Sequence, residues 1–373
     1  MEAAEEEFEE SNKQDDGNKR SFERMLQKSG RGSIALVLPR TWIDQAGLKI
    51  HDRIFLKWQQ DGSLRVAPLK QSEREHWVFV IDANQTTLVH GLGRGIISAY
   101  IEGFNKMKVT SSGGLTKEQY DDIIAHASKL IGLAVIGDSS SSVVIKCYLD
   151  PFKNDVPQLF VRMYSLSSVM LKDSLDSLIN FNPESAKRVA KLDNEVDKIY
   201  YLILRQLFTA ARDPIIAEAL RIVRPLNIVS DRTLAHLIED IGDACHNSCT
   251  KLQKSVKPGG LTPELEQTAS SLRDSICSLY DRAFRAYSLS DRKAANLVIE
   301  DSRQFEKAVD DFDTAISASE KTQNTLNYAL VSELALVGRH CRSIGEIAFN
   351  RAIGVDKEDL LCEGFGIEEE ETN

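Results

Sequence analysis

The stretch Leu234-Ala-His-Leu237-Ile-Glu239-Asp-Ile241-Gly-Asp243-Ala-Cys-His-Asn-Ser-Cys-Thr-Lys-Leu252 decides most of the fold. Its apolar positions 234, 237, 241 and 252 follow the spacing of one face of an α-helix. Glu239 and Asp243 are four residues apart, so their side chains share one face of that helix. The stretch therefore predicts an amphipathic helix that carries a pair of carboxylates.

Helical periodicity extends outward from this stretch and begins at Val156. The apolar stripes fit six helices, with breaks at Lys257-Pro-Gly-Gly260 and at Ser288–Ser290. The helices after the first break repeat the plan of those before it, which predicts a pair of three-helix bundles.

Composition excludes several classes of protein. The chain has 373 residues, enough for two or three domains, and its apolar share of 42% is ordinary for a globular protein. No apolar run reaches the roughly 18 residues that a membrane span needs. The acidic N-terminus lacks the segments of a signal peptide, and the six cysteines form no Cys-x-x-Cys pair. We therefore expect a cytoplasmic chain with reduced thiols and no membrane insertion.

The net charge of −10 is unevenly distributed. Residues 1–20 hold eight acids against three bases, and residues 356–373 hold eight acids against one base. Both ends are expected to be acidic disordered tails. Residues 21–70 instead hold nine bases against four acids, so a small basic module is predicted within an acidic protein.

The basic module is predicted to be mainly β-structure. The expected elements are a strand over Ser33–Leu38, a helical turn over Arg40–Ala46 and a hairpin of residues 54–58 and 64–67 around Asp61-Gly62. So few residues bury too little apolar surface on their own. We therefore expect the module to pair with a second copy, giving a homodimer.

Four motifs in this module carry a resemblance to a known family. They are Gly30-Arg-Gly-Ser33, Leu38-Pro39-Arg40-x-Trp42, Gly47-Leu48-x-x-x-Asp52-Arg53 and Asp61-Gly62-Ser-Leu-x-Val66-x-Pro68. Together they resemble the AbrB/SpoVT/MazE swapped-hairpin domain, although His51 stands where that family usually has glycine. The resemblance implies that two chains interleave hairpins into one barrel whose basic face contacts DNA.

The residues proposed to contact DNA on this basis are Arg24, Lys28, Arg31, Arg40 and Arg53. The alternative is that these side chains form a solvated surface, on a module that serves only for dimerisation or for holding a protein partner.

Residues 71–150 alternate strands and helices. The expected strands are 77–82, 106–110, 133–136 and 143–149, and the expected helices are 86–104 and 117–131. The order β-α-β-α-β-β predicts a small two-layer α/β domain. The cluster Gly91-x-Gly93-x-Gly95 lacks the spacing and the lysine of a phosphate-binding loop, so we attribute it to close helix packing.

A second pair of acids precedes the pair in the opening stretch. Asp193 and Asp197 are also four residues apart, so four carboxylates with Glu239 and Asp243 converge if the two helices are adjacent. Such a group repels itself unless a cation neutralises it. With 56 acids in the chain, however, such pairs also arise by chance on solvated helix faces.

The segment Leu237-Ile238-Glu239-Asp-Ile241-Gly242-Asp243, preceded by Ala211-Arg212-x-Pro214, resembles the PhoU family of phosphate-uptake regulators. The resemblance covers roughly residues 156–353 and implies two three-helix bundles whose acidic motifs bind metal clusters. It assigns an iron or zinc cluster to Asp193, Asp197, Glu239 and Asp243. An AbrB-like module joined to a PhoU-like body is an arrangement typical of archaea.

The second bundle departs from this pattern. The positions that correspond to the four acids are Asp301, Phe305, Ala335 and Arg339, so no second metal cluster is expected, and Arg339 is expected to pair with Asp301. The first bundle raises its own question of register. A straight helix through Pro214 would offset the two acidic pairs by about 12 Å unless Pro225 breaks it.

The fold class predicted is a multidomain, mainly α protein. It comprises a swapped-hairpin module (21–70), an α/β domain (71–150), two PhoU-like bundles (151–256 and 257–355) and acidic tails (1–20 and 356–373). The function expected is a regulator of phosphate uptake that binds DNA through the dimeric module and senses phosphate status through a metal or a partner.

Two alternatives to this function remain. The first is an adaptor that docks on a phosphate transporter or a sensor kinase without binding DNA, and the second is a metal-storing or phosphatase-like bundle. No catalytic motif is present, so we expect no enzyme. Cys245, His246 and Cys249 follow Asp243, and a thiolate or imidazole among them could join a metal. We instead attribute the two cysteines to core packing and His246 to a surface or hydrogen-bonded position.

Overall fold

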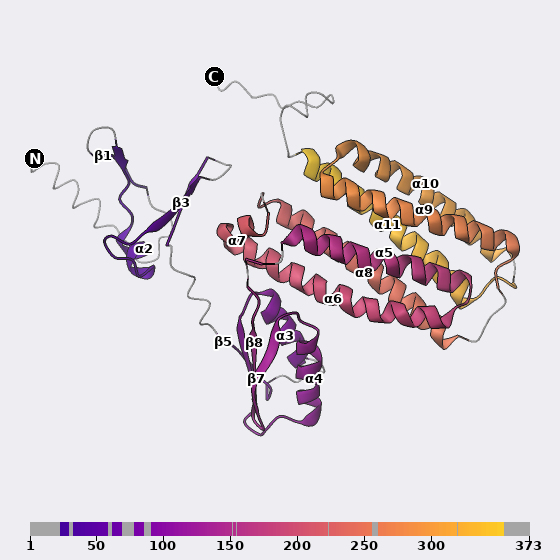
Figure 1. The fold of residues 1–373 in the computed structure, drawn as a ribbon, viewed down its shortest axis with the longest axis horizontal. Helices are drawn as coiled ribbons and strands as arrows, with labels where there is room; N and C mark the ends of the chain where they lie inside the picture. The colour runs from indigo at the N-terminus through magenta and orange to yellow at the C-terminus, as the bar shows by residue number, and fades with distance from the viewer. Residues whose placement is uncertain are drawn as a thin grey trace, which may run out of the picture. The chain divides into compact units, whose positions relative to one another are not determined.

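The computed structural model describes residues 23–29, 33–58, 62–68, 78–85, 91–150, 152–153, 155–222, 224–255, 260–318 and 320–353. Arg31 and the predicted acidic tails, residues 1–20 and 356–373, lie outside these ranges. The chain divides into two compact units, residues 1–75 and 76–373 (Figure 1).

The described residues of the N-terminal unit form two small antiparallel hairpins and one short helix. Its elements are β1 (Gln27–Ser29), β2 (Ser33–Ala35), α2 (Arg40–Gln45), β3 (Ile54–Trp58) and β4 (Leu64–Pro68). β1 pairs with β2, and β3 pairs with β4. β2 ends three residues earlier than the predicted strand, whereas the predicted hairpin over β3 and β4 is confirmed. His51 has a φ of 76°, a conformation that favours glycine and that the motif's usual glycine would adopt freely.

This unit exposes its apolar side chains. None of the described residues from 23 to 68 is buried. Met25, Ile50 and Trp58 are 87%, 88% and 79% exposed. A monomeric module seldom leaves so many large apolar groups in water, because burying each would stabilise it by about 1.5–3 kcal/mol.

Residues 78–147 form the predicted β-α-β-α-β-β layer. The elements are β5 (Val78–Asp82), α3 (Gly91–Ile101), β6 (Lys106–Thr110), α4 (Lys117–Ser128), β7 (Leu133–Ser139) and β8 (Ser142–Cys147). The sheet order is β5-β6-β8-β7, with β5 and β6 parallel and the other pairs antiparallel. Both helices cover one face of the sheet (Figure 1). Tyr100 of α3, Met107 of β6 and Ile123 of α4 are fully buried between the layers.

The glycines of α3 serve helix packing, as expected. A Cβ atom on Gly93 would lie 2.2 Å from Nδ1 of His126 on α4, and one on Gly95 would lie 3.0 Å from Ile81. Only a residue without a side chain therefore allows α3 to lie so close to α4.

Between residues 155 and 353, the part of the helical region that the structure describes contains the six predicted helices and one additional short helix. The first bundle consists of α5 (Val156–Ile179), α6 (Pro183–Arg212) and α8 (Asn227–Lys254), with α7 (Pro214–Ala219) between α6 and α8. The second consists of α9 (Pro263–Leu289), α10 (Arg292–Ser317) and α11 (Thr325–Ile353). Within the described ranges, no helix combines the length and apolarity that a membrane span requires.

Polar caps fix where these helices begin. Asp155, Asn182, Thr262 and Asp291 each accept a hydrogen bond from a backbone N–H of the first turn. In α5, α6 and α9 a proline stands in that first turn, where its missing N–H costs nothing. Each cap contributes about 0.5–2 kcal/mol to stability.

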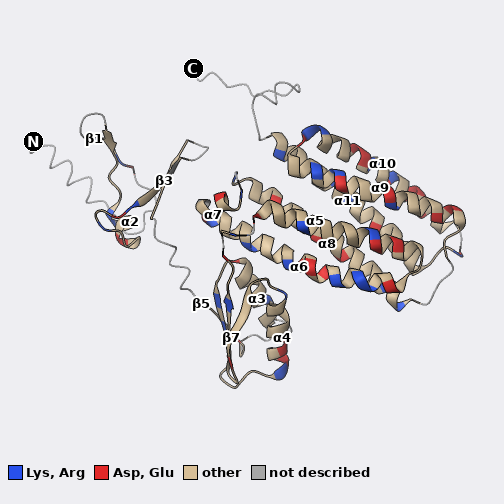
Figure 2. Ribbon diagram, viewed as in Figure 1, with Lys and Arg blue, Asp and Glu red and all other residues tan. Residues whose placement is uncertain are grey.

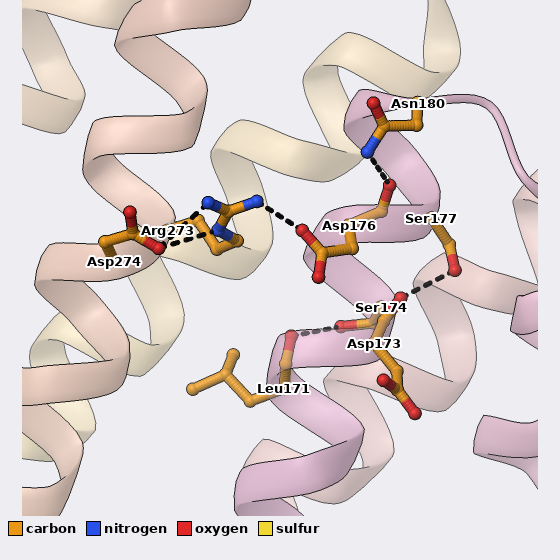
Figure 3. A network of polar contacts seen from close by, with 8 residues as sticks. All are labelled: Leu171, Asp173, Ser174, Asp176, Ser177, Asn180, Arg273 and Asp274. Carbon is orange, nitrogen blue, oxygen red and sulfur yellow. Dashed lines mark hydrogen bonds and ion pairs between the residues drawn. The ribbon is translucent and has the colours of Figure 1, made fainter.

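One apolar core runs through both bundles, and polar contacts join them at its edges. Figure 3 shows Arg273 of α9 bonded to Asp176 of α5 as well as to its neighbour Asp274. Deeper in the interface, the fully buried Glu333 of α11 accepts a hydrogen bond from Ser174 of α5. The two bundles are therefore parts of one packed body.

A buried arginine attaches the α/β layer to α6. Arg205 is 6% exposed and donates hydrogen bonds to backbone oxygens of Tyr100, Gly103 and Phe104 and to the side chain of Asn105. About two turns further along, Arg212 pairs with Glu102. The segment after α3 is thus fixed to the first bundle.

Candidate metal centre

Three of the four predicted acids come together between α6 and α8. One carboxylate oxygen from each of Asp193, Asp197 and Asp243 lies within 4.8 Å of the other two. Gly242 of α8 faces this group, and a Cβ atom there would lie at ordinary packing distances, 3.6 Å from Val196 and 3.9 Å from Oδ1 of Asp193. The helical spacing in each pair and the packing of two helices thus form one acidic group.

The expected offset between the two pairs does not occur. α6 ends at Arg212, and α7 and its flanking residues occupy the chain up to Asn227, where α8 begins. Pro225 lies in this connection, and the N–H of Ile228 donates to its carbonyl oxygen at 3.1 Å. The residues that would have caused the offset therefore lie in the connection between α6 and α8. As a result Asp243 of α8 lies beside Asp193 of α6.

The three carboxylates disfavour their own ionisation. Burial raises the pKa of Asp193 to about 6; the neighbouring His246 opposes this shift, and Asp197 and Asp243 add to it. Burial first, and then the charge of Asp243, raises the pKa of Asp197. Burial and the charge of Asp240 raise the pKa of Asp243. Near neutral pH a bound cation would reduce the repulsion between ionised carboxylates in such a group. Carboxylate oxygens are the ligands that hard cations prefer.

Two basic residues partly supply that charge: His246, which the sequence offers as an additional ligand, and Lys129, which it does not. Nδ1 of His246 lies 3.0 Å from Oδ2 of Asp193. Lys129, which follows α4 in the α/β layer, lowers the pKa of both Asp193 and Asp197 through its charge. The i+3 spacing of His246 after Asp243 could have indicated its role, whereas Lys129 is 64 residues before Asp193 and gave no local signal.

Glu239 lies apart from the three aspartates. Its Oε2 lies 3.3 Å from Nδ1 of His236, and it groups with His236 and Asp240 on α8. Burial and the charge of Asp243 raise the pKa of Glu239 to about 7, whereas His236 lowers it. Glu239, the fourth predicted ligand, is thus near the three aspartates but pairs with His236 and does not join their group.

The second bundle fills the corresponding positions differently. Phe305 is buried and packs against Gly338, where a Cβ atom would lie 3.0 Å from its ring. Asp301 pairs with Arg282 of α9, so the expected pair with Arg339 is wrong: a cation on the adjacent helix already occupies that carboxylate. Among the described residues of the second bundle, no three acids or histidines converge.

The predicted DNA-contacting residues occupy several places in the N-terminal unit. Lys28 is exposed on β1, Arg53 is exposed just before β3, and Arg40 at the start of α2 pairs with Asp44 at 3.1 Å. Nη1 of Arg24 donates to the backbone oxygen of Glu23 at 3.2 Å. Figure 2 shows that basic and acidic residues are interspersed over the two bundles.

Comparison with known proteins identifies the class of the first bundle. A family model described as the PhoU domain matches residues 160–252, which contain both acidic pairs. The matched part of the chain is therefore PhoU-like, as the segment around Glu239 and Asp243 indicates. No curated protein matches the chain.

Two solved structures are similar to part of the chain. PhoU from Pseudomonas aeruginosa is 19% identical over 54% of this chain and 97% of its own, with a TM-score of 0.46. The phosphate transport system regulatory protein PhoU from Streptococcus pneumoniae is 16% identical over 53% of this chain and 89% of its own, with a TM-score of 0.40. These similarities are too low to assign roles to individual side chains of this chain.

Proposed function

We propose that this protein is a regulator of phosphate uptake, and not an enzyme, whose first bundle responds to a bound cation. The observation that carries the proposal is the group of Asp193, Asp197 and Asp243 on helices that match the PhoU domain. Two half-buried carboxylates and one exposed carboxylate at this separation repel one another, and a bound cation would offset that repulsion.

Of the two metals considered, iron suits the donor set better than zinc. The three aspartates offer only oxygen, which hard cations prefer, whereas zinc favours nitrogen and sulfur donors. When bound, the ion supplies the positive charge that His246 and Lys129 now supply in part. Lys129 belongs to the segment after α4 in the α/β layer. A change in the charge of the acidic group would therefore change its electrostatic interaction with Lys129.

We further propose that the N-terminal unit pairs with a second copy and that the dimer binds DNA. The exposed apolar side chains of this unit support the pairing, and the bases Lys28, Arg40 and Arg53 support the contact with phosphates. Arg24 and Arg31 complete the proposed set. A partner of the helical body, such as a phosphate transporter or a sensor kinase, then conveys phosphate status.

The DNA-binding part is tested with the full chain and two variants of equal net charge. Lys28→Gln/Arg40→Gln/Arg53→Gln removes three bases from the N-terminal unit, and Lys153→Gln/Lys187→Gln/Arg303→Gln removes three exposed bases elsewhere. Affinity for the protein's own upstream DNA and for an unrelated duplex is titrated against salt. Only the first variant is expected to bind weakly, with a slope against log salt that falls by about 0.9 for each lost phosphate contact. Equal binding by all three proteins, or none at low salt, would favour the adaptor function.

The regulatory part is tested by phosphate uptake in cells that carry Asp193→Asn/Asp197→Asn/Asp243→Asn in place of the natural protein. Uptake is expected to lose its dependence on external phosphate, whereas Asp301→Asn is expected to leave it intact. Unchanged regulation in the triple variant would contradict a role for the acidic group. Release of phosphate from model esters by the wild-type chain would instead support the phosphatase-like alternative.

A further inference from the structure

We propose a second metal site between the two bundles, formed by His236 and Asp240 of α8 and His340 of α11, which binds a zinc-type divalent cation. This site is separate from the acidic group, and it does not depend on the function proposed above. Its residues are a mixed set of two imidazoles and one carboxylate, a donor set that zinc prefers to the all-oxygen set of the three aspartates.

The Asp240 carboxylate already lies close to both histidines. Oδ2 of Asp240 lies 3.3 Å from Nε2 of His340 and 3.9 Å from Nε2 of His236. Around a tetrahedral zinc ion with bonds of about 2.0–2.1 Å, neighbouring ligand atoms are about 3.3–3.4 Å apart. The two histidines are farther apart than the ligand atoms of the three aspartates, so His236, which is 52% exposed, has to turn toward His340 to complete the three-ligand set.

Glu239 orients the first histidine for this role. Its Oε2 lies 3.3 Å from Nδ1 of His236. In the tautomer that carries its proton on Nδ1, the ring donates to this carboxylate and Nε2 keeps the lone pair that an ion needs. A carboxylate bonded to the far nitrogen of a ligating histidine is the usual support of a zinc site. Support of His236 thus explains why Glu239 lies outside the aspartate group.

His340 provides an independent indication. Its side chain is 17% exposed, and its Nε2 is buried without a well-formed hydrogen bond to any described residue, although Asp240 is near. A buried polar nitrogen without a hydrogen bond lowers the stability of the fold, and a bound metal ion would compensate for that cost. Because His236 and Asp240 are more exposed, an ion could enter from solvent and keep water in its fourth position.

The site would join the bundles. α8 belongs to the first bundle and α11 to the second, so an ion held by both links them at their interface. Binding to the folded state alone stabilises it by mass action, by about 2.7 kcal/mol when free zinc is 100 times the dissociation constant. The protein is therefore expected to unfold at a higher temperature with zinc.

The test is a titration of the full, chelator-treated chain with Zn²⁺ against a chromophoric chelator, together with Co²⁺ absorption in the visible range. The variants are His340→Gln, His236→Gln, Asp240→Asn and Glu239→Gln. Asp193→Asn/Asp243→Asn is the matched control, since it alters only the acidic group. Melting temperatures without metal show whether each variant is folded.

The wild type and the control are expected to bind zinc equally, to give the absorption of tetrahedral Co²⁺ and to melt at a higher temperature with zinc. The three ligand variants are expected to lose that binding, and Glu239→Gln to weaken it about 10–100-fold. Two results would overturn the site: equal zinc binding in the wild type and His340→Gln, or loss of zinc binding only in the control variant.

Discussion

Each bundle places a glycine of its third helix against a residue of its second helix, and the chemistry of the two contacts differs. In the first, Gly242 of α8 lies against Val196 and Asp193 of α6. In the second, Gly338 of α11 lies against Phe305 of α10. A glycine therefore faces the neighbouring helix in both bundles, and the contact at Gly338 is the tighter of the two. The residue on the opposite helix decides whether the contact is acidic or apolar.

Charge balance differs in the same way. The second bundle neutralises its acids with arginines, as in Asp301 with Arg282 and Glu306 with Arg342 at 3.0 Å. In the first bundle three aspartates lie together, and among the described residues only His246 is within ion-pair distance of one of them. These acids of the second bundle are thus paired with arginines, whereas the group in the first bundle is the one for which we propose a cation.

The largest effect is expected from emptying the apolar contact in the second bundle. Phe305→Ala removes a buried ring and leaves a cavity, so the free energy of unfolding should fall by about 3–5 kcal/mol. Leu297→Ala on the same helix is the control, because Leu297 is 59% exposed, and its cost should stay within about 0.5 kcal/mol. Urea unfolding measures both; similar values would show that Phe305 is not a core residue.

The two glycines should respond to alanine with opposite signs. In Gly338→Ala the new Cβ would lie 3.0 Å from the buried ring of Phe305, so we expect a loss of about 1–3 kcal/mol. In Gly242→Ala the nearest atoms are 3.6 Å away, and the better helix propensity of alanine should add up to about 1 kcal/mol. Thermal unfolding of the two variants measures the difference, and equal shifts would contradict the packing described.

The acidic group should make stability depend on pH. Asp193 has its pKa raised from 3.8 to about 6, so its protonated form is favoured by the fold. The resulting stability is fully present below about pH 3.8 and is lost as pH rises through about 6. After allowance for solvent screening, the contribution is on the order of 1 kcal/mol.

The measurement is metal-free urea unfolding of the wild type and Asp193→Asn between pH 4 and 7. The stability of the wild type relative to Asp193→Asn should decrease over this range. A constant difference would show that the raised pKa has no effect on stability.

The smallest effect is expected from the surface pair of the second bundle. Arg282 and Asp301 are both partly exposed, so Asp301→Asn should change the unfolding free energy by less than about 1 kcal/mol. The change should be independent of added metal. A metal-dependent shift in this variant would show that the second bundle also binds a cation.

Local periodicity predicted much of this fold. The six long helices, the order of the α/β layer and the hairpin of β3 and β4 follow from apolar spacing, turns and caps. The short helix α7 was missed because six residues carry too little periodicity. The early end of β2 at Ala35 was also missed, since apolar residues continue to Leu38.

The candidate site was predictable within each helix and unpredictable between helices. Spacing placed Asp193 with Asp197 on one face, but the choice between Glu239 and Asp243 depends on which way each side chain turns on α8. His340 lies 100 residues after Asp240, so no local pattern connects them. The pairing of Asp301 with Arg282 was missed for the same reason, because it depends on the packing of a third helix.

The most direct test of the account is the number of iron ions that the full chain binds. Equilibrium dialysis against Fe²⁺ without oxygen is carried out in a His340→Gln background, which removes the second proposed site. The account predicts that Asp193→Asn/Asp243→Asn abolishes binding, while the matched variant Asp301→Asn/Glu306→Gln binds as much as the parent. Equal binding by both variants would contradict a cation site in the first bundle.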